Sequence, residues 1–389
     1  MSTKSIIKSL LDTDLYKLTT QQMIRKHFPT ASARYKFHDR SKHQCLGHLR
    51  QEIQRQIIAM GGLSLSAEEL CWLLRLEYFD PAYLAYLSEY RFNPEQVLVS
   101  FDVNGDLDIT ISGPWAETVL WEVPLLSIIS ELAAPSFPDY KTFSAATRSK
   151  CDFLDRANTR YVEFGTRRRR SFLSQAIAVE EMARGCRAGF QGTSNVLLAM
   201  FHGVPPKGSM PHEWIMGVYG YTPWNTIWGV NNTAMSLWRE MYGDDSVALT
   251  DTFTSDLFFK HCHREVAEKF SGLRQDSGPP LAFLYKAVAF YQRMGIDPTT
   301  KTIVFSDGLT TNSAIAINEK ARRFVEPVFG IGTHFTNDFP DYPPLNIVIK
   351  LDSVNDVPVV KLSDGRGKET GNPVEIARIK QLLEDNDAH

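Results

Sequence analysis

The second half of the sequence repeats one unit, and this repeat restricts the possible folds. Each unit has a short apolar run, a tip rich in Gly, Asp, Arg or Ser, and an amphipathic stretch. The six tips are E-F-G-T-R (163–167), F-Q-G-T-S (190–194), V-A-L-T-D-T (247–252), G-L-R-Q-D-S-G (272–278), I-V-F-S-D-G (303–308) and V-F-G-I-G-T (328–333). A strand followed by a helix, repeated in this way, predicts parallel βα units whose strand ends gather the functional groups. Because no G-x-G-x-x-G opens a helix near the first strand, an irregular (β/α) barrel is favoured over an open dinucleotide-binding sheet.

The first part of the chain has a different pattern of apolar and polar residues, which predicts an α+β domain with antiparallel strands. Residues 31–38 alternate between apolar and polar side chains, as in a half-buried strand. Residues 96–112 alternate on both sides of Asn104-Gly105, the signature of a hairpin. Ser66-x-x-Glu69 and Asp80-Pro81 each begin a helix.

Further helices and strands complete the expected domain plan. Asp12 or Thr13 is expected to cap a helix that runs to His27, and residues 115–133 predict a long apolar helix interrupted by Pro124. Strands at 345–350 and 357–362 are expected to return to the N-terminal domain, followed by a closing helix at 373–383. We therefore expect an N-terminal α+β domain (1–125, joined by 340–389) and an α/β barrel domain (126–339).

Composition excludes several classes of protein. The net charge of −3 argues against a dedicated nucleic-acid binder, whose pI is usually above about 9. The five cysteines are scattered, without C-x-x-C, so neither a disulfide framework nor a structural zinc site is expected. No apolar run reaches membrane-spanning length. We expect a soluble, cytoplasmic protein that binds neither nucleic acid nor membranes.

Four consecutive arginines, Arg167 to Arg170, follow the apolar run 161–164 and Gly165. Guanidinium groups fixed at a strand end suit an anion, because arginine pairs bidentately with phosphate or carboxylate. A basic surface turn that touches RNA is the alternative for this stretch.

Three carboxylates, Asp251, Asp276 and Asp307, come at three consecutive strand ends. Each could instead cap the helix that follows it, which Asp does well. Together with Arg167 and Arg274, however, they favour a polar site for a ribose and a polyphosphate held with Mg²⁺. The glycines of F-G-I-G-T (329–333) expose backbone N–H groups that can cradle a phosphate.

His212 lies in K-G-S-M-P-H-E-W (207–214), a polar loop that enters a helix. A single histidine is most often structural. At this place it could also act as a nucleophile toward phosphate.

Ten motifs occur in the same order as in nicotinate phosphoribosyltransferases, and the sequence resembles the short bacterial form of that family. They are L-D-T-D-L-Y-K-L, E-F-G-T-R-R-R, G-T-S-N, P-H-E-W, L-T-D-T, G-L-R-Q-D-S-G, V-F-S-D, F-G-I-G-T, L-N-I-V-I-K and K-L-S-D, from about Leu10 to about Asp364. The resemblance implies condensation of nicotinate with phosphoribosyl pyrophosphate to nicotinate mononucleotide and pyrophosphate, for NAD salvage. It also implies Mg²⁺, and ATP hydrolysis coupled through a phosphorylated histidine.

The resemblance also assigns roles to individual residues. Tyr16 and Phe164 are similar to the aromatics that sandwich the pyridine ring, with Tyr16 contributed by the neighbouring subunit if the protein is the expected homodimer. Arg167 resembles the arginine beside the ring, and His212 the phosphorylated histidine. Asp251, Arg274 and Asp276 match residues around ribose, pyrophosphate and metal, with Asp276 as the magnesium ligand. The ribose and 5′-phosphate loops correspond to Asp307, Gly308, Gly330, Gly332 and Thr333.

Thr193-Ser194 departs from the related nicotinamide enzyme, in which an aspartate follows G-T. A carboxylate would repel nicotinate, whereas the Ser194 hydroxyl can donate a hydrogen bond to it, so nicotinate is favoured over nicotinamide. A nicotinamide- or quinolinate-type phosphoribosyltransferase remains the alternative.

Overall fold

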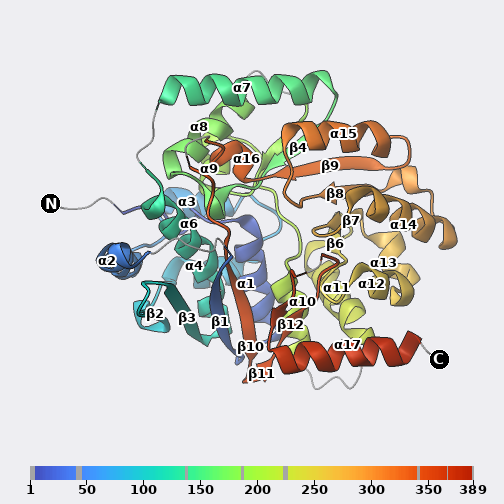
Figure 1. Ribbon diagram of the computed structural model, residues 1–389, viewed down its shortest axis with the longest axis horizontal. Coiled ribbons are helices and arrows are strands. Elements are labelled where there is room, and N and C mark those ends of the chain that lie inside the picture. Colours follow the sequence, from blue (N-terminus) through green and yellow to red (C-terminus); the bar gives the residue numbers. More distant parts are fainter. Residues whose placement is uncertain are drawn as a thin grey trace.

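The computed structural model describes residues 5–40, 46–135, 139–184, 188–221, 227–339, 342–365 and 367–387. Cys45 and Cys186 lie outside these ranges. The described part of the chain forms an antiparallel sheet and a parallel sheet, each packed with helices (Figure 1). None of the helices within these ranges is long and apolar enough to cross a membrane.

The antiparallel sheet has the strand order β11-β10-β1-β3-β2. Its strands are β1 (Ser32–Asp39), β2 (Val97–Phe101), β3 (Leu107–Pro114), β10 (Ile347–Val354) and β11 (Val357–Pro358). Ala33, Tyr35 and Phe37 are buried and alternate with more exposed residues, as the sequence pattern predicted. The predicted β2–β3 hairpin is confirmed. Strand β10, from the C-terminal part of the chain, pairs antiparallel with β1 (Figure 1).

The parallel sheet has the order β5-β4-β9-β8-β7-β6. Its strands are β4 (Arg160–Glu163), β5 (Phe190–Thr193), β6 (Val247–Leu249), β7 (Gly272–Gln275), β8 (Thr302–Phe305) and β9 (Glu326–Ile331). All neighbouring pairs are parallel, so the six predicted tips meet at one edge of the sheet. The expected α/β class is confirmed. Within the described residues no pairing joins β5 to β6, and closure into a barrel stays a prediction.

Helices surround both sheets. They are α1 (Leu15–His27), α2 (Arg50–Met60), α3 (Ala67–Leu73), α4 (Pro81–Glu89), α5 (Trp115–Thr118), α6 (Glu122–Ala133), α7 (Tyr140–Arg156), α8 (Phe172–Ala183), α9 (Val196–His202), α10 (His212–Tyr221), α11 (Trp228–Tyr242), α12 (Ser255–His261), α13 (Arg264–Lys269), α14 (Pro280–Arg293), α15 (Thr311–Ala321), α16 (Thr333–Thr336) and α17 (Pro373–Asp387). A small ladder of β12 (Val360–Lys361) and β13 (Thr370–Gly371) lies beside α17.

Two predicted helix boundaries are wrong. Helix α1 begins at Leu15 with Asp14 at its N-cap, whereas Asp12 pairs with an arginine far along the chain. The apolar stretch 115–133 is divided by a 3₁₀ turn at Val119–Trp121, and Pro124 lies in the first turn of α6. Proline is tolerated there because the first turn has no partners for its N–H groups.

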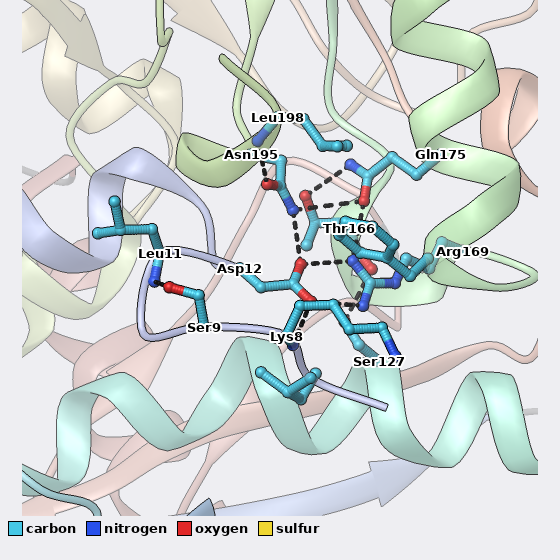
Figure 2. Close-up of polar contacts among 12 residues, drawn as sticks. Lys8, Ser9, Leu11, Asp12, Ser127, Thr166, Arg169, Gln175, Asn195 and Leu198 are labelled. Atoms are coloured by element: carbon cyan, nitrogen blue, oxygen red, sulfur yellow. Dashed lines mark hydrogen bonds and ion pairs between the residues drawn. The ribbon is translucent and has the colours of Figure 1, made fainter. Parts of the chain in front are cut away.

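Two members of the arginine tract are structural. Arg169 is fully buried, and its guanidinium donates to both carboxylate oxygens of Asp12, at 2.6 and 2.9 Å (Figure 2). Asn195 also donates to Asp12, and Gln175 accepts from Arg169 (Figure 2). Arg170 is buried against the rings of Phe339 and Tyr342. A surface turn that binds RNA is therefore wrong for these two arginines, which join the N-terminal segment and later loops to the parallel sheet.

Candidate active site

Two adjoining cavities lie where the parallel strands end. The larger, about 300 Å³, lies over the tips of β4, β7, β8 and β9. The smaller, about 60 Å³, lies between those tips and α1, α10 and β10. Arg167, Arg274 and Asp276 line both, so the two cavities belong to one site.

His212 opens helix α10 and points its ring at two strand ends. Its Nε2 lies 3.0 Å from Asp276 Oδ2 and 3.7 Å from Asp251 Oδ1, and its Nδ1 lies 3.0 Å from the hydroxyl of Thr252. Burial lowers the pKa of His212 to about 4, and Lys361 acts in the same direction. The imidazole is therefore neutral at physiological pH. Because an ionised carboxylate only accepts, Nε2 carries the proton and Thr252 donates to Nδ1.

Asp276 is held ionised by its neighbours. Burial alone would raise its pKa, but Arg274, the hydrogen bond with His212 and Lys361 hold that pKa well below its ordinary value. Arg274 Nη2 lies 2.6 Å from Asp276 Oδ1, and its Nε donates to Ser306.

The alternative role of the three aspartates as helix caps is excluded. In the described chain the N-caps of the helices that follow them are Thr254, Pro279 and Thr310.

The larger cavity contains the glycine-rich tips. Phe164, Gly308, Gly330, Gly332 and Thr333 all line it, so the structure brings these predicted residues together. A Cβ atom on Gly330 would lie 2.4 Å from the Phe164 ring, so this glycine is what lets the aromatic side chain lie flat against β9.

The smaller cavity contains Tyr16 and Arg167. The Tyr16 hydroxyl donates to Glu122 Oε2 at 3.4 Å, and the Arg167 guanidinium lies 5.9 Å from the Tyr16 ring centroid. Tyr16 and Phe164 line different cavities of this single chain, joined by Arg167.

The remaining predicted residues lie outside the two cavities. In the described residues Thr193, Ser194, Asp251 and Asp307 are not among those that line the two cavities. Thr193 donates to Glu163, and Ser194 donates to Asp14 at 2.7 Å, which in turn lies 3.7 Å from Arg167. Ser194 is therefore connected to Arg167 through Asp14. Asp307 forms two 2.7 Å contacts with Lys368.

Charged residues that the sequence analysis did not single out complete the site. Glu122, Glu213 and Lys350 line the smaller cavity, and Lys361 Nζ lies 3.7 Å from Asp276 Oδ2. Burial lowers the pKa of Lys350 to about 8. The two lysines come from β10 and β12, which both lie outside the six tips in sequence. The motifs L-N-I-V-I-K and K-L-S-D, which contain these lysines, were the sequence signal that could have identified them.

The donor set fits a magnesium ion that is bound partly by substrate. No group of three or more His, Cys, Asp or Glu side chains in the described residues forms a complete metal site. Asp251 Oδ1 is buried and has no hydrogen-bond donor among these residues, and Asp276 lies on the adjacent strand. Mg²⁺ is usually held by one or two carboxylates together with phosphate oxygens and water, which these two aspartates can provide.

Comparisons with known proteins agree with this geometry over nearly the whole chain. The model of the nicotinate phosphoribosyltransferase (NAPRTase) family matches residues 159–387, and the model of its N-terminal domain matches residues 11–130. This chain belongs to the nicotinate phosphoribosyltransferase family.

Similar members of the family come from diverse organisms. The nicotinate phosphoribosyltransferase of Chromohalobacter salexigens is 40% identical over 392 aligned positions, covering 97% of this chain and 98% of its own. That of Escherichia coli O9:H4 is 40% identical and covers 93% and 92%. The crystal structure of nicotinate phosphoribosyltransferase from Porphyromonas gingivalis has a TM-score of 0.92 and 39% identity, covering 97% of this chain and 100% of its own.

Proposed function

We propose that this protein condenses nicotinate with phosphoribosyl pyrophosphate, giving nicotinate mononucleotide and pyrophosphate, and that ATP hydrolysis is coupled to this reaction through phosphorylated His212. The single observation that carries the proposal is the neutral His212 in the smaller cavity, beside Asp276, in a chain of this family. We further propose that the protein works in the cytoplasm, as a homodimer, in NAD salvage.

The two cavities suit the two parts of the product. The larger one, with its glycine-rich tips, has the backbone N–H groups and the space for a ribose 5-phosphate. The pyridine ring belongs next to Phe164 and Tyr16, because a flat heteroaromatic ring stacks on aromatic side chains. Arg167 lies between both cavities and offers the nicotinate carboxylate a cation.

Bond formation requires little acid–base chemistry. As pyrophosphate leaves, the ribose carbon acquires oxocarbenium character, as in glycosyl transfer. Arg274, Lys350 and Lys361 lie around Asp276 and can stabilise the departing negative charge. The pyridine nitrogen of nicotinate already has a free lone pair, so the site has only to hold it against the ribose carbon.

His212 has the features of a phosphoryl acceptor. It is neutral, and in the tautomer that carries the proton on Nδ1, with the Thr252 hydroxyl as acceptor, Nε2 has a free lone pair. Attack of this lone pair on the γ-phosphorus of ATP would form the N–P bond, break the bond to the bridging oxygen and release ADP. The phosphoryl group would then lie beside Asp251 and Asp276, with Lys361 close by. Mg²⁺ bound at Asp251 and Asp276 would neutralise phosphate charge there.

A substrate-selection assay tests the proposal. Purified protein is incubated with phosphoribosyl pyrophosphate, Mg²⁺ and either nicotinate, nicotinamide or quinolinate, and nucleotide products are separated by chromatography. We expect nicotinate mononucleotide from nicotinate as the main product. Preferential use of nicotinamide, or carbon dioxide release from quinolinate, would contradict it and support the corresponding relative instead.

A further inference from the structure

Lys17 is a fully buried cation that lies between two carboxylates of the site. Its Nζ is 2.5 Å from Glu122 Oε2 and 2.6 Å from Glu213 Oε1, and its side chain has no exposed surface. A buried lysine of this kind is stable only because both carboxylates compensate its charge. The three residues come from α1, α6 and α10, so Lys17 joins three separate elements.

Glu122 is shared between Lys17 and the proposed nicotinate-binding arginine. Its second oxygen, Oε1, lies 3.6 Å from Arg167 Nη1, an ion pair that is too long for a hydrogen bond. The Tyr16 hydroxyl donates to Oε2, on the Lys17 side of the carboxylate. Lys17 and Tyr16 therefore hold Glu122 through Oε2 and leave Arg167 without a direct hydrogen bond to it.

The other carboxylate is fixed in a similar way. Glu213 follows His212 in the first turn of α10, and Tyr35 donates to its Oε2 at 3.3 Å. Trp115 in turn donates to the Tyr35 hydroxyl. These contacts fix Glu213 to the antiparallel sheet. Glu213 in turn fixes the position of Lys17, and Lys17 attracts the carboxylate of Glu122.

We propose that Lys17 is a positioning residue that keeps Arg167 available for the carboxylate of nicotinate by limiting Glu122 to its long ion pair with Arg167. The inference rests on the proposed use of nicotinate as substrate. Without Lys17, Glu122 would turn to Arg167, because arginine and carboxylate form strong bidentate pairs. Arg167 would then be occupied by a protein carboxylate in place of the substrate's.

The test compares nicotinate binding by four proteins, measured by calorimetry: wild type, Lys17→Met, Glu122→Gln, and the double variant. We expect Lys17→Met to weaken nicotinate binding by about tenfold or more. Glu122→Gln is the reference for the double variant, because it removes the competing charge and also one of the two carboxylates that compensate Lys17. The double variant should recover most of the loss, since the competing charge is gone.

Kinetics separate this role from a purely structural one. In Lys17→Met the KM for nicotinate should rise, while the KM for phosphoribosyl pyrophosphate stays within about threefold of wild type. Lys26→Met is the matched control. Lys26 lies on the same helix, but it is half exposed and its ion pair with Glu240 is long, at 3.8 Å. The proposal is overturned if both KM values rise together, or if the double variant binds nicotinate as poorly as Lys17→Met.

The two ideas fail in different ways. If wild-type protein binds nicotinate but makes no nucleotide, the proposed reaction is wrong, and the binding data on the four proteins still decide the role of Lys17. If wild type makes nucleotide and Lys17→Met binds nicotinate normally, only the inference about Lys17 is wrong.

Discussion

His212 Nε2 lies 3.0 Å from Asp276 Oδ2, across the contact between helix α10 and the end of strand β7. The two residues are 64 positions apart in sequence, and the fold brings them together where the cavities join. This relationship places a neutral imidazole beside an ionised carboxylate, with Arg274 and Lys361 around the carboxylate.

Replacing His212 should uncouple ATP from turnover. His212→Asn should take up no label from γ-labelled ATP and should turn over at the ATP-independent rate of the wild type, because no other neutral imidazole lies at Asp276 in the described site. Labelling and steady-state rates measure this. His202→Asn, on helix α9 and away from both cavities, should behave as wild type. Full labelling of His212→Asn would contradict the proposal that His212 is the phosphorylated residue.

The lowered pKa of His212 predicts a pH effect on stability. Between its folded value of about 4 and its ordinary value of 6.5, the unfolded chain binds a proton that the folded protein does not. The free energy of unfolding should therefore fall as pH falls through this window, by up to about 3 kcal/mol from this group. Urea unfolding at about pH 7 and about pH 5 should show a smaller decrease for His212→Gln than for wild type. Equal decreases would argue that His212 titrates normally.

Gly330→Ala should disturb the aromatic side of the site. The added Cβ would lie 2.4 Å from the ring of Phe164, so the ring has to move. We expect a stability loss of about 1–3 kcal/mol and a nicotinate KM about tenfold higher. At Gly229, in helix α11, a Cβ would meet nothing within 4 Å, so Gly229→Ala should preserve both values. An unchanged KM for nicotinate in Gly330→Ala would show that Phe164 does not contact the pyridine ring of nicotinate.

Arg169→Met should destabilise the fold by about 3–5 kcal/mol, because it leaves the Asp12 carboxylate buried without its cation. Asp12→Leu combined with Arg169→Met should be less destabilised than Arg169→Met alone, since no unpaired charge remains. Arg160→Met, which removes an exposed pair with Glu326, should cost less than about 1 kcal/mol. Denaturant unfolding of the three variants and the wild type measures these differences, and equal losses for Arg160→Met and Arg169→Met would contradict the buried role.

Local patterns in the sequence were sufficient for the elements that carry the site. The alternation at 97–111, the capping box at Ser66 and the six tips depend on neighbouring residues, and the structure has them as predicted. Arg274 and Asp276 were identified because they lie at the end of a predicted strand. The contact between Asp276 and His212 is long-range, and only the family resemblance placed these two residues in one site.

Long-range pairing accounts for what local patterns missed. Four arginines in a row suggest a surface, yet Arg169 is buried because Asp12, 157 positions earlier, neutralises it. The same partner explains why Asp12 does not cap helix α1. Lys17, Lys350 and Lys361 enter the site from α1, β10 and β12, and only the packing of these elements against the tips reveals them.

The most direct measurement is the yield of nicotinate mononucleotide from nicotinate and phosphoribosyl pyrophosphate, with and without ATP, while ADP is measured in the same reaction. The account predicts that ATP raises the yield and that ADP appears in step with the nucleotide. Nucleotide formation at the same rate without ATP, or ADP release that is independent of nicotinate, would contradict a phosphorylated His212 coupled to the transfer. No nucleotide under either condition would contradict the proposed reaction itself.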